Sequence, residues 1–127
     1  MKVVVIIVKL LIVIIVGQTL FFKFTGASES IYIFEQLGAE PYGRIGSGIV
    51  ELLASILILI PRTTLLGALL AFATMLGAIA SHLFVLGINV QNDGGTLFVL
   101  ALVTATASLF LIYQERNKIP DLLKFKI

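Results

Sequence analysis

Four long apolar segments dominate the sequence and constrain its fold more than any other feature. They cover residues 3–22, 43–60, 64–88 and 96–113. A helix needs roughly 20 consecutive apolar residues to cross the hydrocarbon core of a bilayer, and each segment comes near that length. Because lipid offers no partners to backbone N–H and C=O groups, each segment must satisfy these groups internally as a helix. The sequence therefore predicts an all-α integral membrane bundle of four transmembrane helices.

The composition supports a lipid environment and a single transmembrane domain over residues 1–127. Charged residues make up 13 % of the chain and hydrophobic residues 59 %, whereas a soluble domain carries about 25 % charged residues. This excludes a soluble enzyme, and a net charge of +2 is too small to argue for nucleic-acid binding. The chain has no cysteine and a single histidine, so we expect no metal site in one subunit.

The first apolar segment has two interpretations, a retained membrane span or a secretory signal peptide. The apolar core of a signal peptide is about 7–15 residues long and is followed by a small-x-small cleavage site. Residues 3–22 form a longer run, and no such site directly follows them. These flanks favour a retained span.

Lysine and arginine residues gather on one side of the predicted bundle. Lys23 and Arg44 fall on the other side, among acidic residues. By the positive-inside rule, we expect a multi-pass protein of the cell's inner (plasma) membrane, with both termini and the tail 114–127 in the cytoplasm. We interpret Lys9 as an anchor whose long stem reaches the interface. The basic side consists of Lys2, Lys9, Arg62, Arg116, Lys118, Lys124 and Lys126.

The longest loop, residues 23–42, contains the signals of a short amphipathic helix on the outer membrane surface. Ser28 is a candidate N-cap, and Glu29 follows in the first turn, where the helix dipole favours a negative charge. Gly38 and Pro41 provide a stop signal. A plain connecting loop is the alternative.

Small and hydroxyl-bearing residues recur at helical spacing along the later spans. Helices associate in membranes where small residues permit close backbone approach. We therefore predict that these stripes face inward, and packing suffices to explain their Gly, Ala, Ser and Thr positions. The stripes are Arg44, Gly48, Glu51 and Ser55; Gly67, Ala71, Thr74, Ala78 and Ser81; and Ala101, Thr104, Ala105 and Ser108.

Ionisable side chains inside a bilayer are energetically costly, and most of those in the spans fall near the outer side. They form one candidate polar cluster of Lys23, Arg44, Glu51 and His82. At about 1.5 Å of rise per residue, Glu51 and His82 both fall on the order of 10 Å below the outer surface. Lys23 and Arg44 lie on the same side. We expect the last loop to cap this cluster with Asn89, Gln91, Asn92 and Asp93.

Glu51 has three candidate partners within this cluster. Arg44 precedes it by two turns on the same face, Lys23 could reach it from the neighbouring helix, and His82 could bond to it directly. One interpretation is a buried polar contact that fixes helix register. The other is a proton relay or ligand site, because ionisable residues inside membranes are commonly functional.

Several motifs resemble those of the DoxX-like family of small four-helix membrane proteins. Residues 17–24 (GQTLFFKF) resemble the close of its first span, and residues 46–53 (GSGIVELL) resemble its second-span motif. Residues 58–62 (ILIPR) resemble its inner turn, and the third span, with 71–75 (AFATM) and 81–82 (SH), is also similar. The resemblance covers nearly the whole chain and implies that Lys23 and Glu51 are family-typical charged positions.

The resemblance also implies a membrane component of a redox system, since some relatives are linked to thiosulfate:quinone oxidoreduction or to membrane complexes that handle oxidative stress. A quinone would need an apolar cleft and a few polar groups, such as Lys23, Glu51 and His82. An oxidoreductase partner is then expected. The alternatives are a small proton-coupled transporter acting as a homodimer and a structural assembly subunit without activity. No catalytic residue is identifiable, and whether the chain is an enzyme stays open.

Overall fold

The computed structural model describes residues 2–40, 42–88 and 94–118. Four stretches within them are long and apolar enough to cross a membrane, and these residues contain no strand. The prediction of an all-α membrane bundle is confirmed. Pro41, Asn89, Gln91, Asn92, Asp93, Lys124 and Lys126 lie outside the described residues. The elements are α1 (Lys2–Thr25), α2 (Ser28–Gln36), α3 (Tyr42–Leu59), the 3₁₀ turn η1 (Pro61–Thr63), α4 (Thr64–Ser81), the π-helical turn η2 (His82–Leu86), α5 (Thr96–Gln114) and the 3₁₀ turn η3 (Arg116–Lys118).

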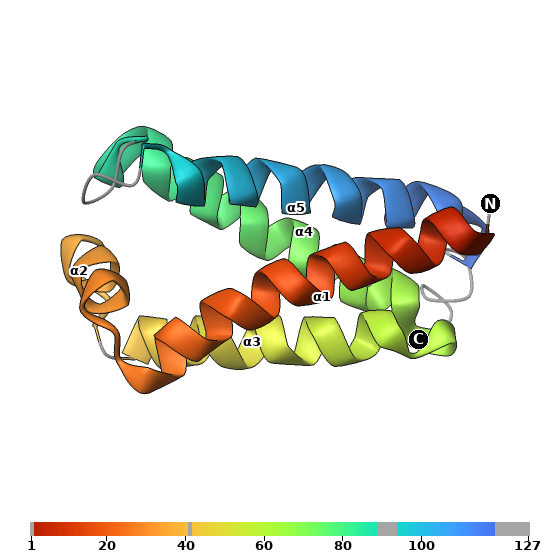
Figure 1. Ribbon diagram of the computed structural model, residues 1–127, viewed down its shortest axis with the longest axis horizontal. Coiled ribbons are helices and arrows are strands. Elements are labelled where there is room, and N and C mark those ends of the chain that lie inside the picture. The colour runs from red at the N-terminus through yellow and green to blue at the C-terminus, as the bar shows by residue number, and fades with distance from the viewer. Residues whose placement is uncertain (1, 41, 89–93, 119–127) are drawn as a thin grey trace, which may run out of the picture.

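The four long helices form a closed ring of neighbours. α1 packs against α3 and α5, and α4 packs against the same two helices from the other side. α1 begins and α5 ends at the same end of the bundle, while α2 lies at the opposite end, which we call the α2 end (Figure 1). The side of the membrane that each end faces stays a prediction from the charge pattern.

The core of the bundle lies away from the α2 end. Ile12, Ile58 and Leu111 are completely buried, and each belongs to a different helix. Around them pack Val16, Leu20, Ala54, Ala68, Ala71 and Ala107. The predicted inward stripes are mostly buried here, and small residues supply much of the contact, as expected for helices that associate in lipid.

The connection between α3 and α4 is short and strongly bonded. The Thr63 hydroxyl donates to the carbonyl of Leu57 at 2.8 Å, and the Thr64 hydroxyl donates to the carbonyl of Ile58 at 2.9 Å. These bonds satisfy carbonyl groups that the end of a helix otherwise leaves without partners. Just beyond the turn, a Cβ on Gly67 would lie 2.6 Å from the backbone nitrogen of Ile58. Only glycine permits this close approach of α4 to α3.

Two helix ends differ from the expected bounds. α1 continues to Thr25, so Lys23 lies within its last turn rather than after it. The α-helix of the third span ends at Ser81, and the chain continues to Leu86 as a π turn. In this turn the Gly87 N–H donates to the carbonyl of His82 at 2.7 Å. The third span, predicted over 64–88, thus consists of α4 followed by a π turn.

The amphipathic helix predicted in the long loop is present as α2. Its N-cap is Ala27, and no side chain caps it, so the assignment of Ser28 as N-cap was wrong. The C-terminal end follows the predicted stop. Gly38 has φ +71°, the N–H of Gly38 donates to the carbonyl of Glu35, and that of Ala39 donates to the carbonyl of Phe34. This is a Schellman motif, in which glycine accepts the left-handed conformation. α2 then contacts α1, α3 and η2.

Candidate functional site

A cavity of about 600 Å³ lies within the α2 end of the bundle. All four long helices line it, together with η2, and α2 adds Ser30, Ile33 and Phe34, followed by its C-cap residue Leu37. α2 lies at this end of the bundle (Figure 1). The cavity combines apolar side chains with a smaller set of polar groups, which is the usual character of a small-molecule site.

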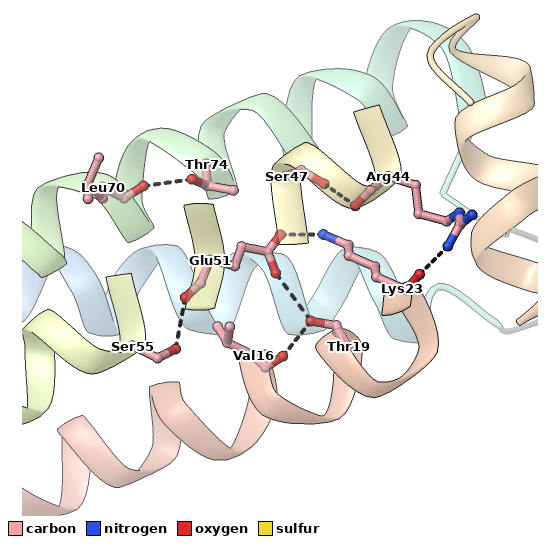
Figure 2. A network of polar contacts seen from close by, with 9 residues as sticks. All are labelled: Val16, Thr19, Lys23, Arg44, Ser47, Glu51, Ser55, Leu70 and Thr74. Carbon is pink, nitrogen blue, oxygen red and sulfur yellow. Dashed lines mark hydrogen bonds and ion pairs between the residues drawn. The ribbon is translucent and has the colours of Figure 1, made fainter. Parts of the chain in front are cut away.

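An ion pair between α1 and α3 forms part of the cavity wall. The Lys23 ammonium group donates to Oε1 of Glu51, and the two side chains are 15 % and 5 % exposed (Figure 2). Two charges removed from water stabilise each other only through such direct contact. Of the three partners considered for Glu51, the structure selects Lys23.

Thr19 is a further partner of Glu51 that the sequence interpretation missed. Its hydroxyl lies 3.3 Å from Oε2 of Glu51 and 2.7 Å from the carbonyl oxygen of Val16 (Figure 2). A threonine hydroxyl has one proton, so it donates to one of these oxygens at a time. The sequence signal was available, because Thr19 precedes Lys23 by one helical turn and shares its face.

Arg44 was one of the three candidate partners of Glu51, but it does not join the ion pair and does not reach Glu51. Its Nε donates to Oε1 of Glu40 at 2.9 Å, one helical turn earlier in the chain. Its Nη1 donates to the backbone carbonyl of Lys23 (Figure 2). Arg44 therefore ties the end of α1 to the segment between α2 and α3, and it does not line the cavity.

His82 lines the cavity together with Glu51, as their matched depth suggested, but its bond goes elsewhere. Its Nδ1 lies 3.0 Å from the carbonyl oxygen of Gly87, and its ring meets the edge of Phe98. A carbonyl only accepts hydrogen bonds, so Nδ1 carries the proton, and in the neutral ring Nε2 is the acceptor. His82 is 5 % exposed. It therefore offers Nε2 as its acceptor for a ligand.

Two buried hydroxyl groups of α5 have no hydrogen-bond partner among the described residues. They belong to Thr104 and Ser108, whose exposed fraction is 0 %. A buried polar group without a partner is costly. Thr104 lines the cavity and Ser108 does not, so only Thr104 is placed to bond a ligand there. The sequence interpretation assigned both residues to packing.

The described part of the chain contains no candidate metal site. Within residues 2–40, 42–88 and 94–118, no group of three or more His, Cys, Asp or Glu side chains could hold a metal ion. The four polar residues expected to cap the cluster from the last loop, Asn89, Gln91, Asn92 and Asp93, lie outside the described residues.

The sequence of the chain matches a family model over residues 7–107, and the model describes the DoxX-like family. This chain belongs to the DoxX-like family. The matched range includes Lys23, Glu51, His82 and Thr104, and thus the polar wall of the cavity. The comparison with curated proteins and the comparison with solved structures each gave no significant match.

Proposed function

We propose that this DoxX-like protein binds a quinone-type ring from the membrane in the cavity under α2. In this proposal it is the membrane component of a redox system, and an oxidoreductase partner supplies or removes the electrons. It lies in the plasma membrane with both termini in the cytoplasm, so the cavity faces the outer leaflet. The observation that carries the proposal is the buried Lys23–Glu51 pair on the wall of an apolar cavity.

The volume of the cavity supports a ring-sized ligand. Pockets for small molecules measure about 300–1,000 Å³, and the cavity measures about 600 Å³. Its wall holds complementary groups for the two states of a quinone. The Lys23 ammonium group and the Thr104 hydroxyl are donors to a quinone carbonyl, and the Nε2 atom of His82 is an acceptor for a quinol hydroxyl.

The charge balance of the wall supports a neutral ligand. The charges of Lys23 and Glu51 offset each other in their ion pair. A neutral ring therefore enters without leaving a buried charge uncompensated, which would be costly in this interior. On reduction, a quinone takes up electrons from the partner and an equal number of protons from the aqueous phase, and Glu51 and Nε2 of His82 are acceptors for the quinol hydroxyls that form.

The direct test is quinone binding by the purified protein in lipid nanodiscs. A tail-less benzoquinone is titrated against the wild type, the double variant Lys23→Met/Glu51→Gln and the variant Glu40→Gln. We expect the double variant to weaken binding about tenfold or more, which corresponds to the loss of one hydrogen bond from a charged group. Glu40→Gln is the matched control because it breaks the other ion pair, outside the cavity.

A second measurement examines the partner. Purification from the native membrane in mild detergent, followed by mass spectrometry, should recover an oxidoreductase subunit and a quinone. An unliganded homo-oligomer that moves protons across liposomes would instead favour the proton-coupled transporter. A protein that binds no benzoquinone and whose Glu51→Gln variant changes only thermal stability would favour the structural subunit.

A further inference from the structure

A second concavity follows the contact between α1 and α5. It is an apolar groove of about 450 Å³, which we call the seam groove. Several of its side chains are half-exposed, with Leu11, Leu102 and Val103 between 38 and 41 % exposed. In a membrane these side chains meet lipid. The groove consists of Val8, Leu11, Leu102, Val103, Thr106, Ala107 and Phe110.

The seam groove continues the cavity along the same pair of helices. On α1, Ile15 lines the cavity, and Leu11, four residues away, lines the groove. On α5, Thr104 lines the cavity, and Ala107, three residues away, lines the groove. Residues three or four apart share a helix face. The two concavities therefore follow one another along the seam between α1 and α5, which meet where α1 begins and α5 ends and diverge toward the α2 end (Figure 1).

The cavity opens toward this seam. Gln18 and Phe22 of α1 and Thr96 of α5 all line the cavity, and all three are exposed. Exposed lining residues mark the mouth of a cavity, because one part of such a side chain faces the interior and another faces the surroundings. A fourth exposed lining residue, Gly77, belongs to α4. Most of the exposed rim of the cavity thus lies on α1 and α5, on a flank of the bundle that would face lipid.

The lining of the seam groove suits a hydrocarbon. Its one polar side chain is Thr106, and the hydroxyl of Thr106 already donates to the carbonyl of Leu102 at 2.9 Å. The groove therefore presents no unsatisfied polar group. The cavity differs, because it holds the Lys23–Glu51 pair and the hydroxyl of Thr104, which has no hydrogen-bond partner among the described residues.

We infer that the cavity and the seam groove form one site for a single-tailed amphiphile. Its polar ring occupies the cavity, and its apolar tail leaves between α1 and α5 and lies along the seam groove. The inference deepens the proposed quinone function and rests on it for the nature of the ring. The occupant of the groove is the tail of the same molecule, because the groove begins within one helical turn of cavity residues on both α1 and α5.

Affinity alone is a weak readout of this geometry. Lipid tails are as apolar as the groove, so moving a tail from lipid into the groove contributes no hydrophobic free energy. The tail is held there only by van der Waals contact and shape complementarity. The position of the tail is the informative quantity. We would therefore use two photoreactive benzoquinones with a decyl tail, one with a diazirine at the ring and one with a diazirine at the tail end.

The experiment uses the full chain in phosphatidylcholine nanodiscs, with labelled residues located by mass spectrometry. We expect the ring probe to label cavity residues and the tail probe to label the groove residues Val8, Leu11, Leu102, Val103, Thr106, Ala107 and Phe110. The variant Val103→Trp fills part of the groove with a larger side chain and should reduce groove labelling by the tail about tenfold. This ratio is the fold-change in binding that the free-energy cost of overpacking would give. Val50→Trp is the matched control, because Val50 lies on α3, is 39 % exposed against 38 % for Val103, and lines neither concavity.

The outcomes separate the inference from the proposed function. Ring labelling in the cavity with tail labelling spread over the lipid-facing residues of α3 and α4 would overturn the inference and leave the quinone function standing. Absence of ring labelling in the cavity would overturn both. A third probe, a photoreactive phosphatidylcholine, tests whether a lipid chain holds the groove instead. We expect the decyl benzoquinone to displace its labelling, and equal labelling with and without the quinone would contradict the inference.

Discussion

Glu51 of α3 accepts its hydrogen bond from Lys23 of α1 in the interior of the bundle, with side chains only 5 % and 15 % exposed. The contact joins two helices that carry no other opposite charges at this depth among the described residues. Removing one member of such a pair leaves the other charge buried and alone, whereas removing both leaves no charge behind. Stability and ligand binding are therefore separable at this site.

We expect Glu51→Gln to lower the free energy of unfolding by about 3–5 kcal/mol, because the Lys23 ammonium group then loses its partner. The double variant Lys23→Met/Glu51→Gln should recover most of this loss. Thermal unfolding in detergent measures both. If the double variant were less stable than Glu51→Gln, the pair would have a structural role that this geometry does not explain.

The two hydroxyl groups without partners give a matched pair of variants. Thr104→Val and Ser108→Ala each remove a buried hydroxyl that makes no hydrogen bond within the described part of the chain, so each should leave stability unchanged or raise it by up to about 1 kcal/mol. Only Thr104→Val should weaken benzoquinone binding, by about tenfold, because only Thr104 lines the cavity. Equal effects of the two variants on binding would remove Thr104 from the site.

Gly67→Ala should disrupt the contact between α3 and α4. The new Cβ would lie 2.6 Å from the nitrogen of Ile58 and 2.7 Å from the carbonyl oxygen of Ala54. Both are backbone atoms, so the helices must separate, and we expect a loss of about 2 kcal/mol or more in stability. Gly77→Ala on the same helix meets nothing within 4 Å and should be neutral or slightly stabilising. Circular dichroism during heating compares the two variants.

His82→Leu should loosen the end of the third span. The variant removes the bond from Nδ1 to the carbonyl of Gly87, while the bond from the Gly87 N–H to the carbonyl of residue 82 remains. We expect hydrogen exchange in residues 82–88 to become faster, by about tenfold for a lost hydrogen bond of about 1.4 kcal/mol. Phe84→Leu is the control, because Phe84 is 83 % exposed. Unchanged exchange in His82→Leu would show that the side chain does not hold this turn.

The number of spans and their inward faces were predictable because lipid imposes simple rules. A helix that crosses the membrane must be long and apolar, and its contact face must be small. The burial of Gly48, Ser55 and Ser108 follows from that rule alone. The pairing of Lys23 with Glu51 could only be predicted as one of three options. The sequence does not specify how each helix is rotated about its axis, and this rotation decides which long side chain lies beside Glu51.

Other features depend on backbone detail that a sequence pattern does not specify. The π turn at His82 replaces one regular hydrogen-bond pattern by another without any change in hydropathy. The spacing of Arg44 and Glu51 made Arg44 a candidate partner of Glu51. Glu40, however, lies only one helical turn from Arg44, and Arg44 pairs with it without extending into the membrane. Thr104 lines the cavity and has no hydrogen-bond partner in the residues that the structure describes, and only the three-dimensional arrangement reveals this.

The tight turn between α3 and α4 has a mechanical consequence. Two threonine hydroxyls bond carbonyls across it, and at Gly67 the two backbones meet without a side chain between them. Such a hairpin has little freedom to bend or slide, so it behaves as one stiff rod. We therefore expect any expansion that admits a larger guest to come mainly from displacement of α1, whose contact with α5 is the least extensive between neighbouring long helices.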